Sequence, residues 1–226
     1  MVIDKENTLK RIIDNGTVSS QFYVLMSISA TIAIAGLLLN ASSFIIGSML
    51  ISPLGGSIAL LGLSLARLDM TLFKRGLECL VTGMLLILLI SFLVTYFFPS
   101  KDITPEILVR THPNIYDLLV STIAGGALGY IMVREDFHTN AGVIIGVGIA
   151  TSVVPPLATV GYGFAVPDYT IAKGAFVLFF SNISAIALGC SYIFRYFQLS
   201  ESNRFVYYIF ATFVVLVVLS FLYLHL

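Results

Sequence analysis

The chain alternates between long apolar stretches and short clusters of charge. The 24 charged residues are clustered, and six long intervals between the clusters contain no charge. These intervals run from Asp14 to Arg67, from Glu78 to Lys101, from Asp117 to Arg134, from Asp136 to Asp168, from Lys173 to Arg195, and from Arg204 to the end. A helix needs about 20 apolar residues to cross the hydrocarbon core of a bilayer. The intervals hold seven such segments, at 21–39, 43–65, 77–98, 116–133, 141–165, 172–194 and 205–225. The pattern predicts an all-α integral membrane protein with about seven transmembrane helices.

Composition agrees with this class. Of the 226 residues, 58% are hydrophobic and 11% are charged, mean hydropathy is +0.99 and the formal net charge is zero. A soluble domain is about one-quarter charged. These values exclude a disordered chain, a binder of nucleic acid through a basic surface, and a secreted disulfide scaffold. We therefore expect one transmembrane domain over residues 21–226, in contact with the lipid bilayer.

Residues 1–20 are predicted to form a cytoplasmic amphipathic segment. Val2, Leu9, Ile12 and Ile13 share one face of a short helix, and Gly16 is placed to end it. A helix lying on the membrane surface is the expected arrangement. A helix that docks on a partner is the alternative.

Orientation follows from the distribution of Lys and Arg. If every span crosses, one side receives nine of them: Lys5, Lys10, Arg11, Arg67, Lys74, Arg75, Arg134, Arg195 and Arg204. The other side receives three: Lys101, Arg110 and Lys173. Because cytoplasmic loops carry the excess of basic residues, we expect a multi-pass protein of the cell membrane with a cytoplasmic N-terminus.

Parts of the sequence recur after about 100 residues. The matching segments, in the same order, are 40–47 with 140–146, 51–54 with 154–157, and 69–71 with 168–170. A period that contains three spans reverses the direction of the second copy. The sequence thus predicts two inverted three-helix repeats, at 21–98 and 116–194. The extra helix at 205–225 is apolar all round, which favours subunit contact in a homo-oligomer.

Spans two and five differ from the others because helix-breaking and polar residues interrupt them. Span two carries Ser48, Ser52, Pro53, Gly55, Gly56 and Ser57 near its middle. Span five carries Thr151, Ser152, Pro155, Pro156 and Thr159. Proline removes a backbone donor and clashes with the preceding turn, and glycine makes the backbone permissive. We expect both helices to break halfway across the membrane.

Such interruptions at corresponding places in two repeats are typical of a transporter site. The predicted path for solute runs between the polar residues of spans two and five, with Asn182 nearby. For Asn182, a structural hydrogen bond between helices is the alternative role. Half-helix N-termini aimed at the midplane favour an anion or a carboxylate. A transporter or channel for a small polar solute or ion is the first hypothesis, and a receptor or scaffold that binds a small ligand without moving it is the alternative.

Two runs resemble a known family. Residues 47–56 read Gly-Ser-Met-Leu-Ile-Ser-Pro-Leu-Gly-Gly, and residues 150–158 read Ala-Thr-Ser-Val-Val-Pro-Pro-Leu-Ala. Together they are similar to the uncharacterised hydrophobic-domain membrane proteins grouped as domain of unknown function 389. The resemblance covers nearly the whole chain, most clearly from Asn40 to Asp168. It implies a multi-pass helical fold and names no substrate.

Two short motifs have more than one interpretation. Residues Thr159 to Gly163 spell the selectivity-filter sequence of potassium channels, which makes a cation channel a second alternative function. Coincidence in a glycine-rich helix end is the competing explanation. Gly125 and Gly129 form a GxxxG pattern that permits close helix contact. We expect packing within the chain there rather than a subunit interface.

The sequence holds no constellation typical of an enzyme. His112, His138 and His225 are scattered, without metal-ligand spacing. No Ser/His/Asp set, phosphate-binding loop or HExxH motif is present. The expectation is a protein without catalytic activity, cofactor or metal.

Overall fold

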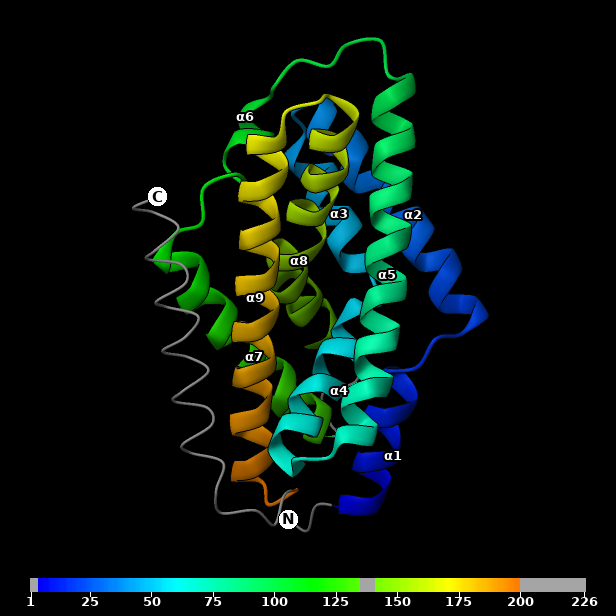
Figure 1. The fold of residues 1–226 in the computed structure, drawn as a ribbon. Coiled ribbons are helices and arrows are strands. Elements are labelled where there is room, and N and C mark those ends of the chain that lie inside the picture. Colours follow the sequence, from blue (N-terminus) through cyan, green and yellow to red (C-terminus); the bar gives the residue numbers. More distant parts are fainter. Residues whose placement is uncertain (1–3, 135–140, 200–226) are drawn as a thin grey trace.

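The computed structural model describes residues 4–134 and 141–199, and of residues 141–152 only the backbone. The expected seventh helix at 205–225 lies outside the described residues. Those that are described form nine helices (Figure 1). They are α1 (Lys5–Asn15), α2 (Ser20–Leu38), α3 (Ser42–Ile51), α4 (Leu54–Arg67), α5 (Met70–Phe97), α6 (Pro105–Leu108), α7 (Ile115–Val133), α8 (Ala141–Ala165) and α9 (Tyr169–Tyr196).

Four of these helices, α2, α5, α7 and α9, are long and apolar enough to cross a membrane. The pair α3 and α4 forms a fifth candidate span, bent by 58° at a short break. The apolar part of α8 with described side chains, Val153–Ala165, is shorter than a full span. An all-helical membrane protein is thus confirmed, with four or five candidate spans in the described part of the chain. The count of seven stays a prediction.

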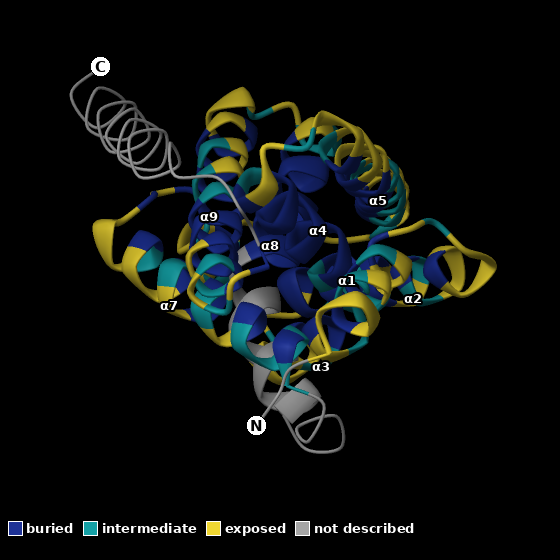
Figure 2. Cartoon of the chain, turned by 90° about the horizontal axis from the view of Figure 1, so that it is seen from below, coloured by how far each residue is buried: buried dark blue, intermediate teal, exposed yellow. Residues whose placement is uncertain are grey.

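The centre of the helix bundle is formed by α4 and α8. Figure 2 shows α4 and the part of α8 with described side chains in the dark blue of buried residues, with exposed residues on the outward faces of the surrounding helices. Large apolar side chains cover those outer faces: Leu85 of α5 is 62% exposed and Ile123 of α7 is 73% exposed. An apolar surface of this kind is unfavourable in water and suits contact with lipid.

Helices α5 and α9 begin in the same way and have the same length of 28 residues. The Asp69 carboxylate accepts from the backbone N–H of Thr71 at 2.8 Å, and the Asp168 carboxylate accepts from that of Thr170 at 3.0 Å. A side-chain oxygen in this position satisfies a free N–H of the first turn. Helices α2 and α7 likewise have 19 residues each. In Figure 1, α5 runs upward and α9 runs downward.

The N-terminal helix α1 packs on α4. Gly16 ends it, as predicted, and Ile12 is fully buried. The approach is so close that a Cβ atom on Gly56 would lie 1.9 Å from the backbone oxygen of Asn15. The apolar side of α1 therefore faces the helix bundle, and its place relative to the membrane surface stays a prediction.

Helices α7 and α9 are in backbone contact along the GxxxG segment. A Cβ atom on Gly125 would lie 2.1 Å from the backbone oxygen of Ile186, and one on Gly189 would lie 2.3 Å from that of Thr122. The thiol of Cys190 also donates to the Gly125 oxygen at 3.1 Å. These contacts confirm the expected packing within the chain.

Candidate functional site

The predicted break in span two is confirmed. Helix α3 ends at Ile51, Ser52 has an extended backbone (φ −66°, ψ 126°), and α4 begins at Leu54. The cause is Pro53, which offers no N–H to the carbonyl of Met49 and disfavours helical geometry in the residue before it. The Ser52 hydroxyl oxygen accepts a long 3.4 Å hydrogen bond from Leu54 N–H. Two half-helices therefore meet at Ser52 and Pro53.

The adjacent glycines do not contribute to this break. Gly55 and Gly56 lie in the first turn of α4 and are helical. Glycine is needed at position 56 for a different reason: the end of α1 lies so close that a side chain there would clash with its backbone. The prediction that these glycines unwind the span is corrected accordingly.

The predicted break in span five is wrong. Helix α8 continues from Ala141 to Ala165 with Pro155 and Pro156 inside it. Prolines within membrane helices are tolerated where neighbouring helices and side-chain hydroxyls support the freed backbone. Here Val154 and Leu157 are fully buried. The helix therefore loses two hydrogen bonds without ending, and no half-helix termini form at this place.

The predicted site residues of α3, α4 and α8 with described side chains are mostly buried, and their hydroxyls are engaged. Ser48 donates to the Ile45 oxygen at 2.6 Å, and Ser57 donates to the Leu54 oxygen at 2.8 Å. Thr159 donates to the Pro155 oxygen at 2.9 Å. Each bond lies within the residue's own helix, so these hydroxyls keep only their lone pairs for a solute. The side chains of Thr151 and Ser152 lie outside the described part of the structure.

Asn182 lies in α9 and is 3% exposed. Helix α9 packs against both α4 and α8. Asn182 is therefore enclosed by protein in a helix that contacts both α4 and α8, and its place beside the path stays a prediction.

The filter interpretation of Thr159 to Gly163 is wrong. A selectivity filter needs backbone carbonyls directed at a common axis, but this run is part of the continuous helix α8. The Tyr162 oxygen accepts from Val166 N–H at 2.9 Å, as in a helix. The Tyr162 hydroxyl donates to the Lys101 oxygen at 2.7 Å, which ties α8 to the loop after α5. The run is a packing element and does not support a cation channel.

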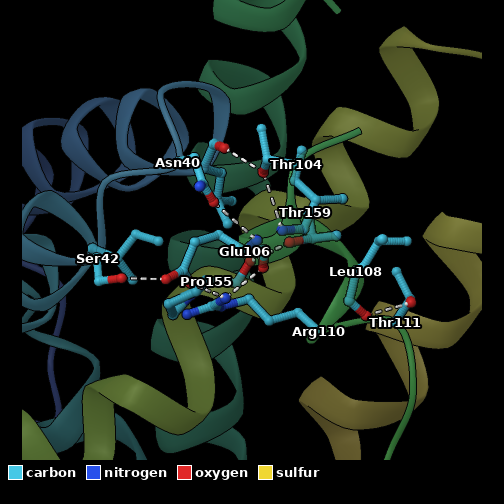
Figure 3. Close-up of polar contacts among 12 residues, drawn as sticks. Asn40, Ser42, Thr104, Glu106, Leu108, Arg110, Thr111, Pro155 and Thr159 are labelled. Atoms are coloured by element: carbon cyan, nitrogen blue, oxygen red, sulfur yellow. Dashed lines mark hydrogen bonds and ion pairs between the residues drawn. The ribbon is translucent and has the colours of Figure 1, made fainter. Parts of the chain in front are cut away.

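A polar cluster that sequence reasoning missed lies around the short helix α6 (Figure 3). Arg110 Nη1 forms an ion pair with Glu106 Oε2 at 2.6 Å. The Ser42 hydroxyl, at the start of α3, donates to the other carboxylate oxygen of Glu106. The Glu106 N–H donates to Asn40 Oδ1 at 3.4 Å, and the Thr104 hydroxyl donates to the Leu37 oxygen at 2.7 Å. The cluster fastens α6 to the turn between α2 and α3.

Arg110 is more enclosed than its partner Glu106. Its side chain is 15% exposed. Its Nε atom is buried and has no hydrogen-bond partner among the described residues. The only sequence signal was a Glu four residues before an Arg, a spacing that places the two side chains together on a helix. That signal pairs Glu106 with Arg110 but does not indicate what else they contact.

The surroundings of Glu106 shift its pKa in two directions. Burial raises the pKa, but hydrogen bonds from Ser42 and Arg110 and the positive charge of Arg110 lower it more, so the net pKa lies below the usual value. Since the folded pKa is depressed, the ionised carboxylate contributes stability that is present above the unfolded pKa and is lost as the pH falls through the folded one.

We expect this contribution to vanish only in acid below the usual titration range of glutamate. The measurement compares the thermal midpoint of the wild type with that of Glu106→Gln from about pH 7 to about pH 3. The wild type should be the more stable at neutral pH, and the difference should shrink at the acid end. An equal difference at every pH would contradict this account.

A small pocket of about 200 Å³ lies near this cluster. Its lining consists of Ile103, Leu108, Thr111, His112, Asp168, Thr170 and Ile171. Asp168 is engaged in capping α9. Within residues 4–134 and the described side chains of the second half, no group of three or more His, Cys, Asp or Glu residues could hold a metal ion.

Comparison with known proteins adds a family but no activity. The model of the family described as Domain of unknown function (DUF389) matches residues 49–188. An uncharacterized protein of Methanocaldococcus jannaschii is 26% identical over 187 residues, which are 83% of this chain and 57% of that protein. The chain therefore aligns with just over half the length of this relative. No solved structure matches the chain.

Proposed function

The chain belongs to the DUF389 family of unknown function, and from its geometry we propose that it is a membrane transporter or channel for a small polar solute or ion. The proposed path follows the break between α3 and α4 and the proline-containing part of α8. Since α3 packs directly against α8, the two elements are neighbours.

The broken span carries this proposal. The apolar pair α3 and α4 bends by 58°, and residues on both sides of the break, Met49 and Leu54, are 1% exposed. An irregular backbone at membrane depth is tolerated where it is enclosed by protein or lines a wet cavity. Interrupted helices near the midplane are a recurring feature of solute sites in transporters.

Similarities between the two halves of the chain support the same proposal. The helices that correspond by sequence, α2 with α7 and α5 with α9, have equal lengths and matched positions in their halves. The two halves also contact each other in a reciprocal way: α4 of the first half packs on α9 of the second, and α8 of the second half packs on α5 of the first. We propose that the two halves are inverted repeats and that the segment at 205–225 is the extra helix through which a homo-oligomer forms.

The proposed solute is an anion or carries a carboxylate, and this preference is slight. The N-cap residue of α4 is Pro53, whose side chain cannot cap the helix, and the Ser52 hydroxyl accepts one long bond, from Leu54 N–H. Free N–H groups and the helix dipole favour negative charge at such an end. The absence of a break in α8 leaves this single half-helix N-terminus in place of the two expected. No catalytic step is part of the proposal.

A receptor or scaffold is the second candidate. It is favoured by the buried hydroxyls of Ser48, Ser57 and Thr159, which donate to their own helices rather than toward a common space. A protein of this kind would bind a small ligand at the break without moving it.

We propose that the end formed by α1, the α4–α5 turn and the last turns of α7 and α9 faces the cytoplasm. Arg11 of α1 donates to the Met132 oxygen of α7, and Arg67 of α4 donates to the Leu199 oxygen after α9 at 3.3 Å. These contacts support the grouping of the basic clusters at one end, and Figure 1 draws α1, the α4–α5 turn and the end of α9 at the same end of the bundle. The excess of Lys and Arg at this end supports the cytoplasmic assignment.

The function is tested by flux into proteoliposomes that contain the full chain. Anions, cations and small carboxylates are offered separately, with Pro53→Ala and Pro156→Ala beside the wild type. Pro53→Ala returns a donor to the Met49 carbonyl and is expected to reduce flux about tenfold or more. Pro156→Ala should have a smaller effect, because α8 is already continuous.

The matched control is Pro99→Ala, in an exposed loop position after α5, which should leave flux unchanged. Folded yield, measured by size-exclusion chromatography, should fall less than flux in Pro53→Ala. If wild-type vesicles move no probe, the receptor or scaffold replaces the transporter. If flux is present but unaffected by both span prolines, the break is a packing feature.

A further inference from the structure

Arg110 has binding capacity that its ion pair does not use. A guanidinium carries five N–H donors in a planar fork. Toward Glu106 it uses Nη1, which reaches both the carboxylate and the backbone oxygen of the same residue. Its Nε–H is buried and meets no acceptor among the described residues. A buried donor without an acceptor costs free energy, so this edge of the guanidinium is suited to an incoming oxygen atom.

Glu106 shows what this place recognises. Its carboxylate is held by two donors from separate elements, the Ser42 hydroxyl of α3 and the Arg110 guanidinium that follows α6. Together they form a binding site for a carboxylate, and its occupant is a side chain of the same protein. The occupant is tethered by α6, which Asn40 and Thr104 fasten in turn.

The position of the pair connects it to the proposed path. Ser42 opens α3, the helix that leads down to the break at Pro53. Helix α3 in turn packs against α8. An anion bound to Arg110 would therefore lie where the chain turns from α2 into α3, at one end of the α3–α8 contact.

We propose that Arg110 is the anion-recognition residue of this path, that the solute is a small carboxylate or a similar planar oxyanion, and that Glu106 is an internal competitor for the same guanidinium. This inference deepens the proposed function and rests on it for the route of the solute. The incoming carboxylate takes the Nε–H edge that Glu106 leaves unused, and it competes with Glu106 for the positive charge of the same guanidinium.

The donor set favours an anion over a cation. Both carboxylate oxygens of Glu106 already accept hydrogen bonds, and the adjacent Arg110 charge repels a second cation. Planar carboxylates match the arginine fork, with two parallel N–H···O bonds. An ammonium would find no comparable set of acceptors among these residues.

The test measures binding and flux separately. The full chain in detergent is heated in increasing sodium acetate at constant ionic strength, since a ligand that binds the folded state raises the thermal midpoint. The same proteins are reconstituted, and uptake of radiolabelled acetate is compared with that of rubidium. The variants are Glu106→Gln, Arg110→Gln, Arg110→Lys and Lys101→Gln. The last removes an exposed cation from the same end and controls for the general electrostatic field.

Glu106→Gln is the decisive variant, because a misfolded protein does not gain affinity. Removing the competing carboxylate should lower the half-maximal acetate concentration by about fivefold or more. Arg110→Gln should abolish the acetate-dependent stabilisation and the preference for acetate over rubidium. Arg110→Lys should retain part of both, since it keeps the charge and loses the fork. Lys101→Gln should behave as the wild type.

An unchanged half-maximal concentration in Glu106→Gln would overturn the inference, as would equal losses in Arg110→Gln and Lys101→Gln. Stabilisation by acetate with the expected shifts, but without wild-type flux of any probe, would support recognition by Arg110 and overturn the transporter. Flux of acetate that is insensitive to Glu106 and Arg110 would support the transporter and overturn this inference alone.

Discussion

Gly125→Ala is expected to destabilise the protein by about 3 kcal/mol or more, whereas Gly126→Ala at the next position should be neutral or slightly stabilising. A Cβ atom at Gly125 would lie 2.1 Å from the Ile186 backbone oxygen, and α7 and α9 would have to separate along their contact. At Gly126 the nearest atom would be 3.9 Å away, on the Ile193 side chain. The thermal midpoint of unfolding in detergent, compared with that of the wild type, measures the effect of each variant.

Gly126→Ala is the matched control because both changes add one methyl group to the same turn of α7. Alanine also favours helix over glycine by roughly 0.5–1 kcal/mol, a gain that both variants share. Equal midpoints for the two variants would contradict the close approach of α7 and α9.

Cysteines at positions 74 and 101 are expected to react with a membrane-impermeant maleimide from opposite sides of the membrane. Lys74 lies near the start of α5 and Lys101 lies just beyond its end, and α5 is a candidate span of 28 residues. Both side chains are exposed. In sealed vesicles, a maleimide added from one side should label one of the two cysteines fully and the other not at all. If the proposed orientation holds, position 101 reacts from outside in whole cells.

The native thiols provide the control for this experiment. Cys79 and Cys190 are 1% and 0% exposed, so the unmodified chain should give little background. Labelling of positions 74 and 101 from the same side would show that α5 does not cross, and the sidedness of all later elements would have to be reassigned.

Local features of the chain were accessible to sequence reasoning. Asp69 and Asp168 were identified as parts of a repeat, and both cap helices of equal length. Pro53 breaks span two because the loss of its N–H and its effect on Ser52 act within one turn. Gly16 ends α1 for a similarly local reason. Such effects depend on neighbours along the chain, which the sequence displays.

The errors come from positions where packing decides the outcome. Pro155 and Pro156 carry the same local signal as Pro53, yet α8 stays continuous between its neighbours. Local propensity cannot distinguish these cases, because the support comes from other helices. The cluster around Glu106 was missed for the same reason, since Ser42 is 64 residues away along the chain.

The burial of α4 constrains the order in which the protein can be assembled during synthesis. Its Gly62 fits against Cys190 and Ala187 of α9, so the ribosome completes the partner long after α4 has left the exit tunnel. In the interval, α4 can pack on α5, but the face that α9 covers has no partner yet. Truncated chains that stop before α9 would therefore leave this face of α4 uncovered. The last third of the protein is needed to stabilise the folded first half.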